Sequence, residues 1–109
     1  MNSTNGNSAL SDKSQHGYEI LDGHNDNIAV KTGVSGGRIT ADGQSYRGNS
    51  QAARWNKNAG EPGRYQSVLV KSIPEGPGAR KDILQWESEN AARLRAIGQL
   101  ADPTKHVRP

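Results

Sequence analysis

Two glutamates near the end of the chain lie in a stretch that is typical of a long helix. Residues 79–97 contain no Pro or Gly, and Gly98 follows them. A helix advances by about 100° per residue, so its apolar side chains form one stripe. The stripe consists of Ile83, Leu84, Ala91, Leu94 and Ile97. Glu87 falls in the middle of it, whereas Glu89 falls on the opposite, solvated face. The sequence therefore predicts that one carboxylate faces the protein.

A carboxylate that faces inward needs a partner, because burying a bare charge is costly. One interpretation is a structural ion pair between Glu87 and an arginine at the edge of the core. The other is a hard cation such as Mg²⁺, held by Glu87 and otherwise by water and phosphate. Asn90 falls on the same face, where it can orient Glu87 or simply fill the rim.

A shorter helix is predicted within residues 45–58, and it carries a polar stripe. Residues at steps of three and four share a helix face, which here consists of Arg47, Gln51, Arg54 and Asn58. Ala52 and Trp55 lie away from it and are predicted to pack. The polar face is either an ordinary solvated surface or a grip for phosphate, which a guanidinium group binds in a bidentate manner without losing its charge.

Other residues with chemical potential are less informative. The histidines, His16, His24 and His106, do not have the spacing of a compact metal motif, and we expect each to be exposed in a loop or in the tail. Tyr18 follows Gly17 and is either a core aromatic residue or a phenol that faces a site.

The elements that position these residues follow from periodicity and turn formers. Apolar residues at every second position predict a β-hairpin with strands near 17–21 and 27–34, and Gly33 to Gly37 then form a glycine-rich exit. Ser45 or Asn49 caps the shorter helix, which ends near residues 60–63. Residues 65–73 are predicted as a third strand that stops at Pro74. The order β-β-α-β-α indicates a small α+β domain, a three-stranded antiparallel sheet flanked by helices.

Composition limits the possible classes. A chain of 109 residues with 31% hydrophobic residues predicts one domain, monomeric, with a thin core. The absence of Cys excludes disulfides, zinc-thiolate sites and thiol nucleophiles. The net charge of +3 favours polyanionic partners, and no apolar run approaches the ~20 residues that cross a bilayer. Residues 1–15 are expected to be a flexible lead-in or linker, and residues 16–109 the domain.

Taken together, these residues resemble the GIY-YIG nuclease superfamily. The resemblance rests on Gly17-Tyr18-Glu19, on Lys31 to Ser35 after the hairpin, on Arg47 in one helix and on Glu87 in a later one. More closely, the chain is similar to the URI-like C-terminal toxin modules of Rhs and contact-dependent inhibition proteins. That similarity is carried by Ser45 to Gln51, Trp86-Glu87 and His106 to Pro109, and it spans roughly residues 17–109.

The resemblance implies a role for each matching position. Tyr18 would lie near the attacking water, Gly33 would be the glycine of the second motif, Arg47 would stabilise the phosphate, and Glu87 would hold one divalent cation, Mg²⁺ or another. The second motif lacks its tyrosine, so Lys31, Tyr18 or a histidine would act as the general base. Arg38, Arg54 and Lys57 would line the nucleic-acid backbone.

We therefore expect a metal-dependent endonuclease, with DNA the favoured substrate. As the toxin module of a larger secreted protein, it would act in the cytoplasm of a target cell and would be inhibited by a dedicated immunity protein. The alternatives are a metal-independent ribonuclease toxin and a non-catalytic module that binds nucleic acid through the same basic face. A protein-interaction domain is disfavoured, because no exposed apolar stripe is evident.

Overall fold

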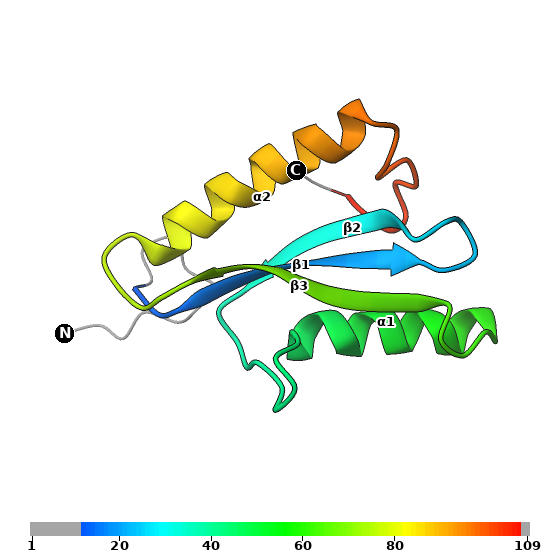
Figure 1. Ribbon diagram of the computed structural model, residues 1–109, viewed down its shortest axis with the longest axis horizontal. Helices are drawn as coiled ribbons and strands as arrows, with labels where there is room; N and C mark the ends of the chain where they lie inside the picture. Colours follow the sequence, from blue (N-terminus) through cyan, green and yellow to red (C-terminus); the bar gives the residue numbers. More distant parts are fainter. Residues whose placement is uncertain (1–11, 108–109) are drawn as a thin grey trace.

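The computed structural model describes residues 12–107, which form a three-stranded antiparallel sheet with one helix on each face (Figure 1). The elements in chain order are β1 (Gln15–Asp22), β2 (Ile28–Ser35), α1 (Tyr46–Ala59), β3 (Tyr65–Ile73) and α2 (Ala79–Ala96). The strand order is β2-β1-β3, with β1 in the centre. The predicted α+β class and the order β-β-α-β-α are confirmed.

The predicted lead-in, residues 1–15, lies mostly outside the described residues, but its last four residues belong to the fold. Gln15 is buried and opens β1. The backbone carbonyl of Asp12 accepts a hydrogen bond from the Gly76 N–H at 2.8 Å, and its side chain accepts one from the Gly78 N–H at 3.3 Å. These contacts join the segment before β1 to the turn before α2.

The predicted hairpin is formed by β1 and β2, and a β-bulge interrupts its register. Leu21 pairs with Ala29, but Ile20 pairs with Lys31, so Val30 is the additional residue on β2. A bulge changes the face on which the following residues lie. Lys31 consequently lies opposite Ile20, on the face that also carries Tyr18, two residues away on β1.

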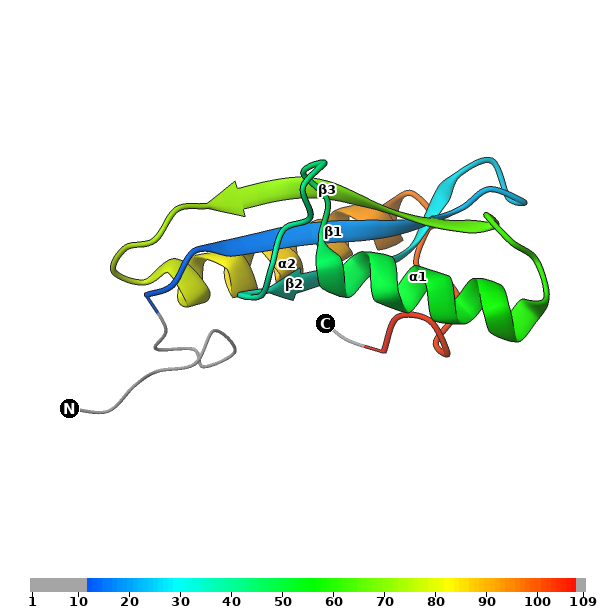
Figure 2. The same cartoon turned by 90° about the horizontal axis from the view of Figure 1, so that it is seen from below.

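Helix α1 covers one face of the sheet. Its first turn is capped by Ser45, whose Oγ accepts a hydrogen bond from the Gly48 N–H at 3.0 Å. Of the two predicted N-cap residues, Ser45 is therefore the one confirmed. Figure 2, in which the molecule is seen from below, shows α1 lying along this face. Ala52 and Trp55 pack against a cluster that includes Tyr18 and Tyr65, which confirms the predicted apolar side of the helix.

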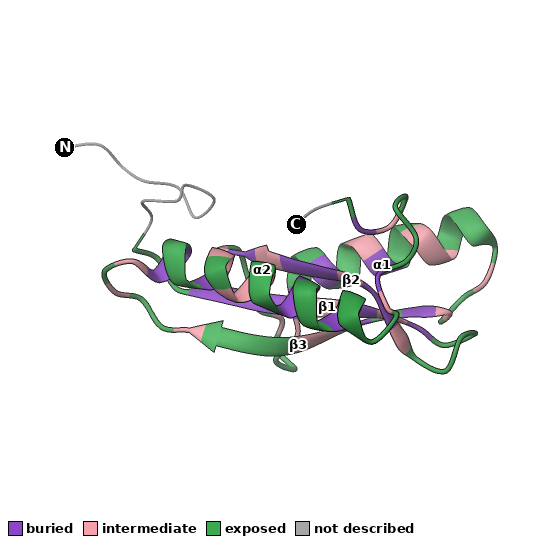
Figure 3. Cartoon of the chain, turned by 90° about the horizontal axis from the view of Figure 1, so that it is seen from above, coloured by how far each residue is buried: buried purple, intermediate pink, exposed green. Residues whose placement is uncertain are grey.

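Helix α2 covers the opposite face. Ile83, Ala91 and Leu94 are buried and Glu89 is exposed, as the predicted stripe requires. The prediction is wrong for Ile97, which is 60% exposed, because the helix ends at Ala96 and Gly98 turns the chain with a φ of 84°. Figure 3 shows that burial is concentrated in β1 and β2, whereas the last residues of β3 are mostly exposed.

The segment after α2 runs along the outer edge of β2 (Figure 1). Ala29 donates its N–H to Gln99 Oε1 at 2.6 Å and accepts a hydrogen bond from the Leu100 N–H at 3.1 Å. Further along β2, the Thr32 N–H donates to His106 Nδ1 at 3.4 Å. This tail therefore satisfies backbone groups of β2, which in the described part of the chain has no strand partner on that side.

Within residues 12–107, no helix has the length and apolar character required to span a membrane.

Candidate functional site

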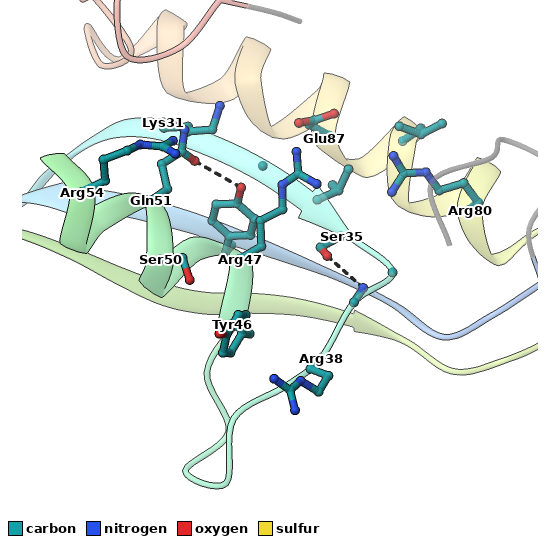
Figure 4. Close-up of a pocket in the computed structure, with 16 residues that line it drawn as sticks. Lys31, Ser35, Arg38, Tyr46, Arg47, Ser50, Gln51, Arg54, Arg80 and Glu87 are labelled. Carbon is teal, nitrogen blue, oxygen red and sulfur yellow. Dashed lines mark hydrogen bonds between the residues drawn. The ribbon is translucent and has the colours of Figure 1, made fainter. Parts of the chain in front are cut away.

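A pocket of about 740 Å³ lies at the β2 edge of the sheet, between the N-terminal part of α1 and the first half of α2. Its wall includes the end of β2 and the predicted glycine-rich exit, residues 33–37. Figure 4 shows that Arg47 of α1 and Arg80 and Glu87 of α2 extend towards one another across this space. Because the two helices lie on opposite faces of the sheet, their side chains meet in one pocket by extending past the edge formed by β2.

Glu87 lies on the α2 wall of the pocket and is partly buried, as predicted. Three cationic side chains face it, Lys31 from β2, Arg47 from α1 and Arg80 from α2 (Figure 4). Burial raises the pKa of the Glu87 carboxyl, and the charges of these cations lower it by less. The site therefore surrounds a single carboxylate with an excess of positive charge.

The structure brings Arg47 and Glu87 into the same pocket although they are forty residues apart in the sequence. Arg47 lies in the first turn of α1, exposed, with its guanidinium group turned towards α2 (Figure 4). Guanidinium groups bind phosphate in a bidentate manner and remain charged at all physiological pH values. The pair thus supplies an anion-binding group and a carboxylate on facing walls.

Tyr18 and Lys31 line the same pocket but differ in their protonation chemistry. Tyr18 is 1% exposed, its hydroxyl donates to Gln51 Oε1 at 3.4 Å, and burial raises its pKa although Arg47 opposes the shift. Burial lowers the pKa of the Lys31 ammonium group, and the Glu87 charge opposes that shift. Burial favours the neutral form of both groups, so Lys31 more readily offers a neutral amine as proton acceptor, whereas Tyr18 retains its proton and acts as a hydrogen-bonding group.

Two glycines fix the position of the Tyr18 ring. A Cβ atom at Gly33 would lie 2.5 Å from Tyr18 Cζ, and one at Gly48 would lie 2.9 Å from Tyr18 Cδ2. Gly33 faces Tyr18 across the β1–β2 ladder, and Gly48 belongs to the first turn of α1. The close approach of strand, ring and helix therefore requires the absence of side chains at both positions.

The three residues predicted to bind the nucleic-acid backbone do not lie together. Arg38 and Arg54 line the pocket at different points (Figure 4). Arg38 also lies over the ring of Tyr46, with Cζ 4.9 Å from the ring centroid. Lys57 is exposed in the last turn of α1 and is not among the lining residues, so the structure places it at the helix C-terminus, where a cation complements the helix dipole.

Arg80 belongs to the site, and the sequence analysis missed it. It is the second residue of α2, seven residues before Glu87, and lines the same pocket. On the helical scale used for Glu87 it falls at about 60°, within the apolar stripe. A search for charged residues inside that stripe, applied to both signs of charge, would have found it.

The histidine expectation is wrong for two of the three residues. His16 is buried in β1, where Nε2 lies 2.8 Å from Ser45 Oγ, and burial lowers its pKa. His106 is also buried, against Thr32. His24 alone is exposed, with Nδ1 3.4 Å from Glu61 Oε2. No histidine of the described part of the chain lines the pocket, so Lys31 and Tyr18 remain as the candidate bases there.

Asn90 does not orient Glu87, as one interpretation proposed. Its amide donates to Glu19 Oε2 at 2.9 Å and to Thr32 Oγ1 at 3.1 Å, and its Oδ1 accepts two hydrogen bonds from Arg93. Asn90 thus holds a buried polar network between α2 and the sheet. Asn90 does not reach the pocket because its position on the helix directs its side chain towards β1 and β2 and not towards α1.

Across residues 12–107, no three His, Cys, Asp or Glu side chains gather into a group that could hold a metal ion. Comparisons with family models, with curated proteins and with solved structures find no match to this chain. The resemblance to GIY-YIG nucleases therefore remains a prediction, and the pocket itself is the basis on which a function can be proposed.

Proposed function

We propose that the chain is a nuclease that hydrolyses phosphodiester bonds of nucleic acid in this pocket. The observation that carries the proposal is the arrangement of Glu87 opposite Arg47, with Lys31 and Tyr18 beside them. A phosphodiester is an anion that gains further charge as water attacks it, so it requires cationic side chains and a group that accepts a proton. Both are present within one solvent-accessible pocket.

Each side chain has a role in the proposed hydrolysis. Arg47 binds the non-bridging oxygens and neutralises the charge that develops on them. Lys31, in its neutral form, accepts the proton of the water that forms the new P–O bond, because burial lowers its pKa. Tyr18 keeps its proton, because burial raises its pKa, and positions the water or the phosphate by hydrogen bonding. The P–O bond to the leaving oxygen then breaks, and that oxygen takes up a proton from solvent or from the Lys31 ammonium group formed in the attack.

Glu87 is the residue that would hold a divalent cation. Mg²⁺ commonly binds one or two carboxylates and completes its six ligands with water and substrate phosphate, so a single partly buried carboxylate suits a cation that binds together with the substrate. When bound, the cation supplies Lewis-acid stabilisation of the phosphate and of the leaving oxygen.

The metal-independent ribonuclease is the second candidate, and a specific observation favours it. Three cations already surround Glu87, and burial raises its pKa, so the carboxyl can serve as a proton donor to a leaving oxygen. Such a site would use the 2′-hydroxyl of RNA as the nucleophile and would leave DNA intact. The requirement for a metal therefore separates the two candidates.

The wider biological role follows from the resemblance to toxin modules. We propose that the domain is delivered as the toxin part of a larger bacterial protein and cuts nucleic acid, DNA before RNA, in the cytoplasm of the target cell. A dedicated immunity protein would then cover the pocket with an acidic surface, because the pocket is cationic.

A cleavage assay with matched variants tests the proposal. Supercoiled plasmid and a structured RNA are incubated with the protein in Mg²⁺ or in chelator. We expect plasmid to be cleaved in Mg²⁺ and not in chelator. Glu87→Gln should lower the cleavage rate by about 10³-fold or more. Glu89→Gln, which removes a charge from the exposed face of the same helix, should not lower it.

The other outcomes of the assay are also decisive. Cleavage of RNA alone, undiminished by chelator, would assign the metal-independent reaction. Binding of either polymer without cleavage in both conditions would reject the nuclease and leave a binding module. A fully active Glu87→Gln variant would remove Glu87 from the mechanism.

A further inference from the structure

Arg80 is a buried cation whose hydrogen bonding is incomplete. The residue is 9% exposed and lines the pocket that contains Glu87. Its Nη1 donates to Gln15 Oε1 at 3.1 Å, which anchors the guanidinium group to the start of β1. Its Nε is buried and has no hydrogen-bond partner among residues 12–107. One edge of the planar group is thus held by the protein, while a donor on its other edge is unused.

Burial of this cation is not compensated by an ion pair. Within the described residues, no carboxylate oxygen lies within 4.0 Å of the Arg80 guanidinium nitrogens. Burial lowers its pKa, the charge of Glu87 opposes that shift, and the charge of Arg47 adds to it. Arginine keeps its charge in proteins, so a buried guanidinium group with an unused donor favours the arrival of an anion.

The pocket determines which anion can reach it. Arg80 and Arg47 come from different helices, and both guanidinium groups extend into the space in front of Glu87 (Figure 4). An arginine presents its donors as a rigid fork that matches the oxygens of phosphate. A tetrahedral phosphate oxyanion between the two helices would accept hydrogen bonds from the two guanidinium groups and would add the missing negative charge.

We propose that Arg80 is a phosphate-binding residue of this site, which acts with Arg47 as a two-helix clamp on the substrate. This inference rests on the proposed function only in taking a nucleic-acid phosphate as the ligand. Gln15 is a positioning residue, because it fixes one end of the guanidinium group while the group extends towards the space in front of Glu87. The competing explanation is structural, namely that Arg80 serves only to tie α2 to β1.

Binding measurements in an inactive background separate these explanations. Glu87→Gln is used as the parent, with a fluorescein-labelled single-stranded DNA of twelve nucleotides and its RNA counterpart as probes, and the dissociation constant is measured by anisotropy over a range of salt concentrations. We expect Arg80→Gln to weaken binding about tenfold and to lower the slope of log K against log salt by about 0.7, the value for one lost contact to a single strand.

Lys81→Gln provides the matched control. It removes the same charge from the next residue of α2, which is exposed and does not line the pocket, so both the affinity and the slope should remain near those of the parent. Arg80→Lys retains the charge without the fork, and it should keep the salt slope while losing part of the affinity. Arg80→Lys also serves if Arg80→Gln fails to fold.

A spectroscopic measurement reports directly on the Arg80 guanidinium group. In the Glu87→Gln parent labelled with ¹⁵N-arginine, addition of the DNA probe should move the Nε–H signal of Arg80, assigned from its loss in Arg80→Lys. An unchanged signal with a bound probe, or an unchanged salt slope in Arg80→Gln, would reject the clamp and assign Arg80 a structural role. Either result leaves cleavage by the unmodified protein unaffected, so the nuclease proposal stands or falls separately.

Discussion

Gly33 lies so close to Tyr18 that the tyrosine ring occupies the space of a side chain at that position. The Cβ atom of any other residue would be 2.5 Å from Cζ and 2.6 Å from the hydroxyl oxygen of Tyr18. The two residues pair across β1 and β2, so neither can move without disturbing the ladder. The Tyr18 phenol can therefore occupy its position in the pocket only because residue 33 on the neighbouring strand is glycine.

Gly33→Ala should lower the free energy of unfolding by about 1–3 kcal/mol, because the methyl group forces the ring or the strand to shift. It should also lower activity, because Tyr18 loses its place beside Arg47. Urea denaturation and the cleavage assay measure the two effects. Gly76→Ala is the control, since a Cβ there meets nothing within 4 Å, and it should change stability by no more than about 0.5 kcal/mol. Equal stability of the two variants would contradict the packing described.

Glu87→Gln should stabilise the protein at neutral pH, and the gain should depend on pH. Burial raises the pKa of Glu87 above its ordinary value of 4.5, so the folded state binds the proton more strongly than the unfolded state does. The stability that this proton contributes is fully present below pH 4.5 and is lost as the pH rises through the folded pKa. Glutamine stays neutral and is spared this loss.

Urea unfolding of both proteins from pH 4 to pH 8 measures this effect. The difference between Glu87→Gln and the unmodified protein should be smallest at the acidic end, grow with pH and then level off. Glu89→Gln, on the exposed face, should show no such trend. A Glu87→Gln protein that is less stable at pH 8 than at pH 4, relative to the unmodified protein, would show that the three neighbouring cations outweigh burial.

The pH dependence of cleavage should identify the general base. If Lys31 accepts the proton, kcat/KM rises with pH along a limb that lies below 10.5, because burial lowers the pKa of Lys31 from that value. Lys31→Arg should remove the limb and lower the rate by about 10²–10⁴-fold, since arginine cannot deprotonate. Tyr18→Phe should leave the limb in place.

The opposite pattern would assign the role to Tyr18. Burial raises its pKa above 10.0, so a phenolate base would give a limb at higher pH that disappears in Tyr18→Phe and persists in Lys31→Arg. Matched initial rates across buffers of constant ionic strength are needed, because binding of nucleic acid depends steeply on salt.

The fold could be predicted from local patterns because each pattern has a direct physical cause. The strand at 65–73 and the cap at Ser45 follow from β-branched residues and from a side-chain oxygen at a helix start, and both are confirmed. Helical periodicity likewise placed Glu87 on an inward face. Ile97 was wrong because periodicity does not state where a helix ends.

The candidate site could be predicted only in part, because it depends on contacts between distant segments. The β-bulge at Val30, which turns Lys31 towards Tyr18, has no signature in the sequence. The burial of His16 also escaped prediction, because it depends on Ser45, twenty-nine residues away. Arg80 was missed for another reason, since charge inside the apolar stripe was sought only among carboxylates.

The tail that follows α2 has a consequence for self-association. Within the described residues it hydrogen-bonds β2 at Ala29 and Thr32, whereas Gly33, Val34 and Ser35 of the same strand line the pocket. The first half of the edge is therefore closed to a strand from another molecule, and the second half stays accessible for a ligand. Any ligand that fills the pocket would complete the protection of this edge, so a bound substrate or inhibitor should also act against aggregation.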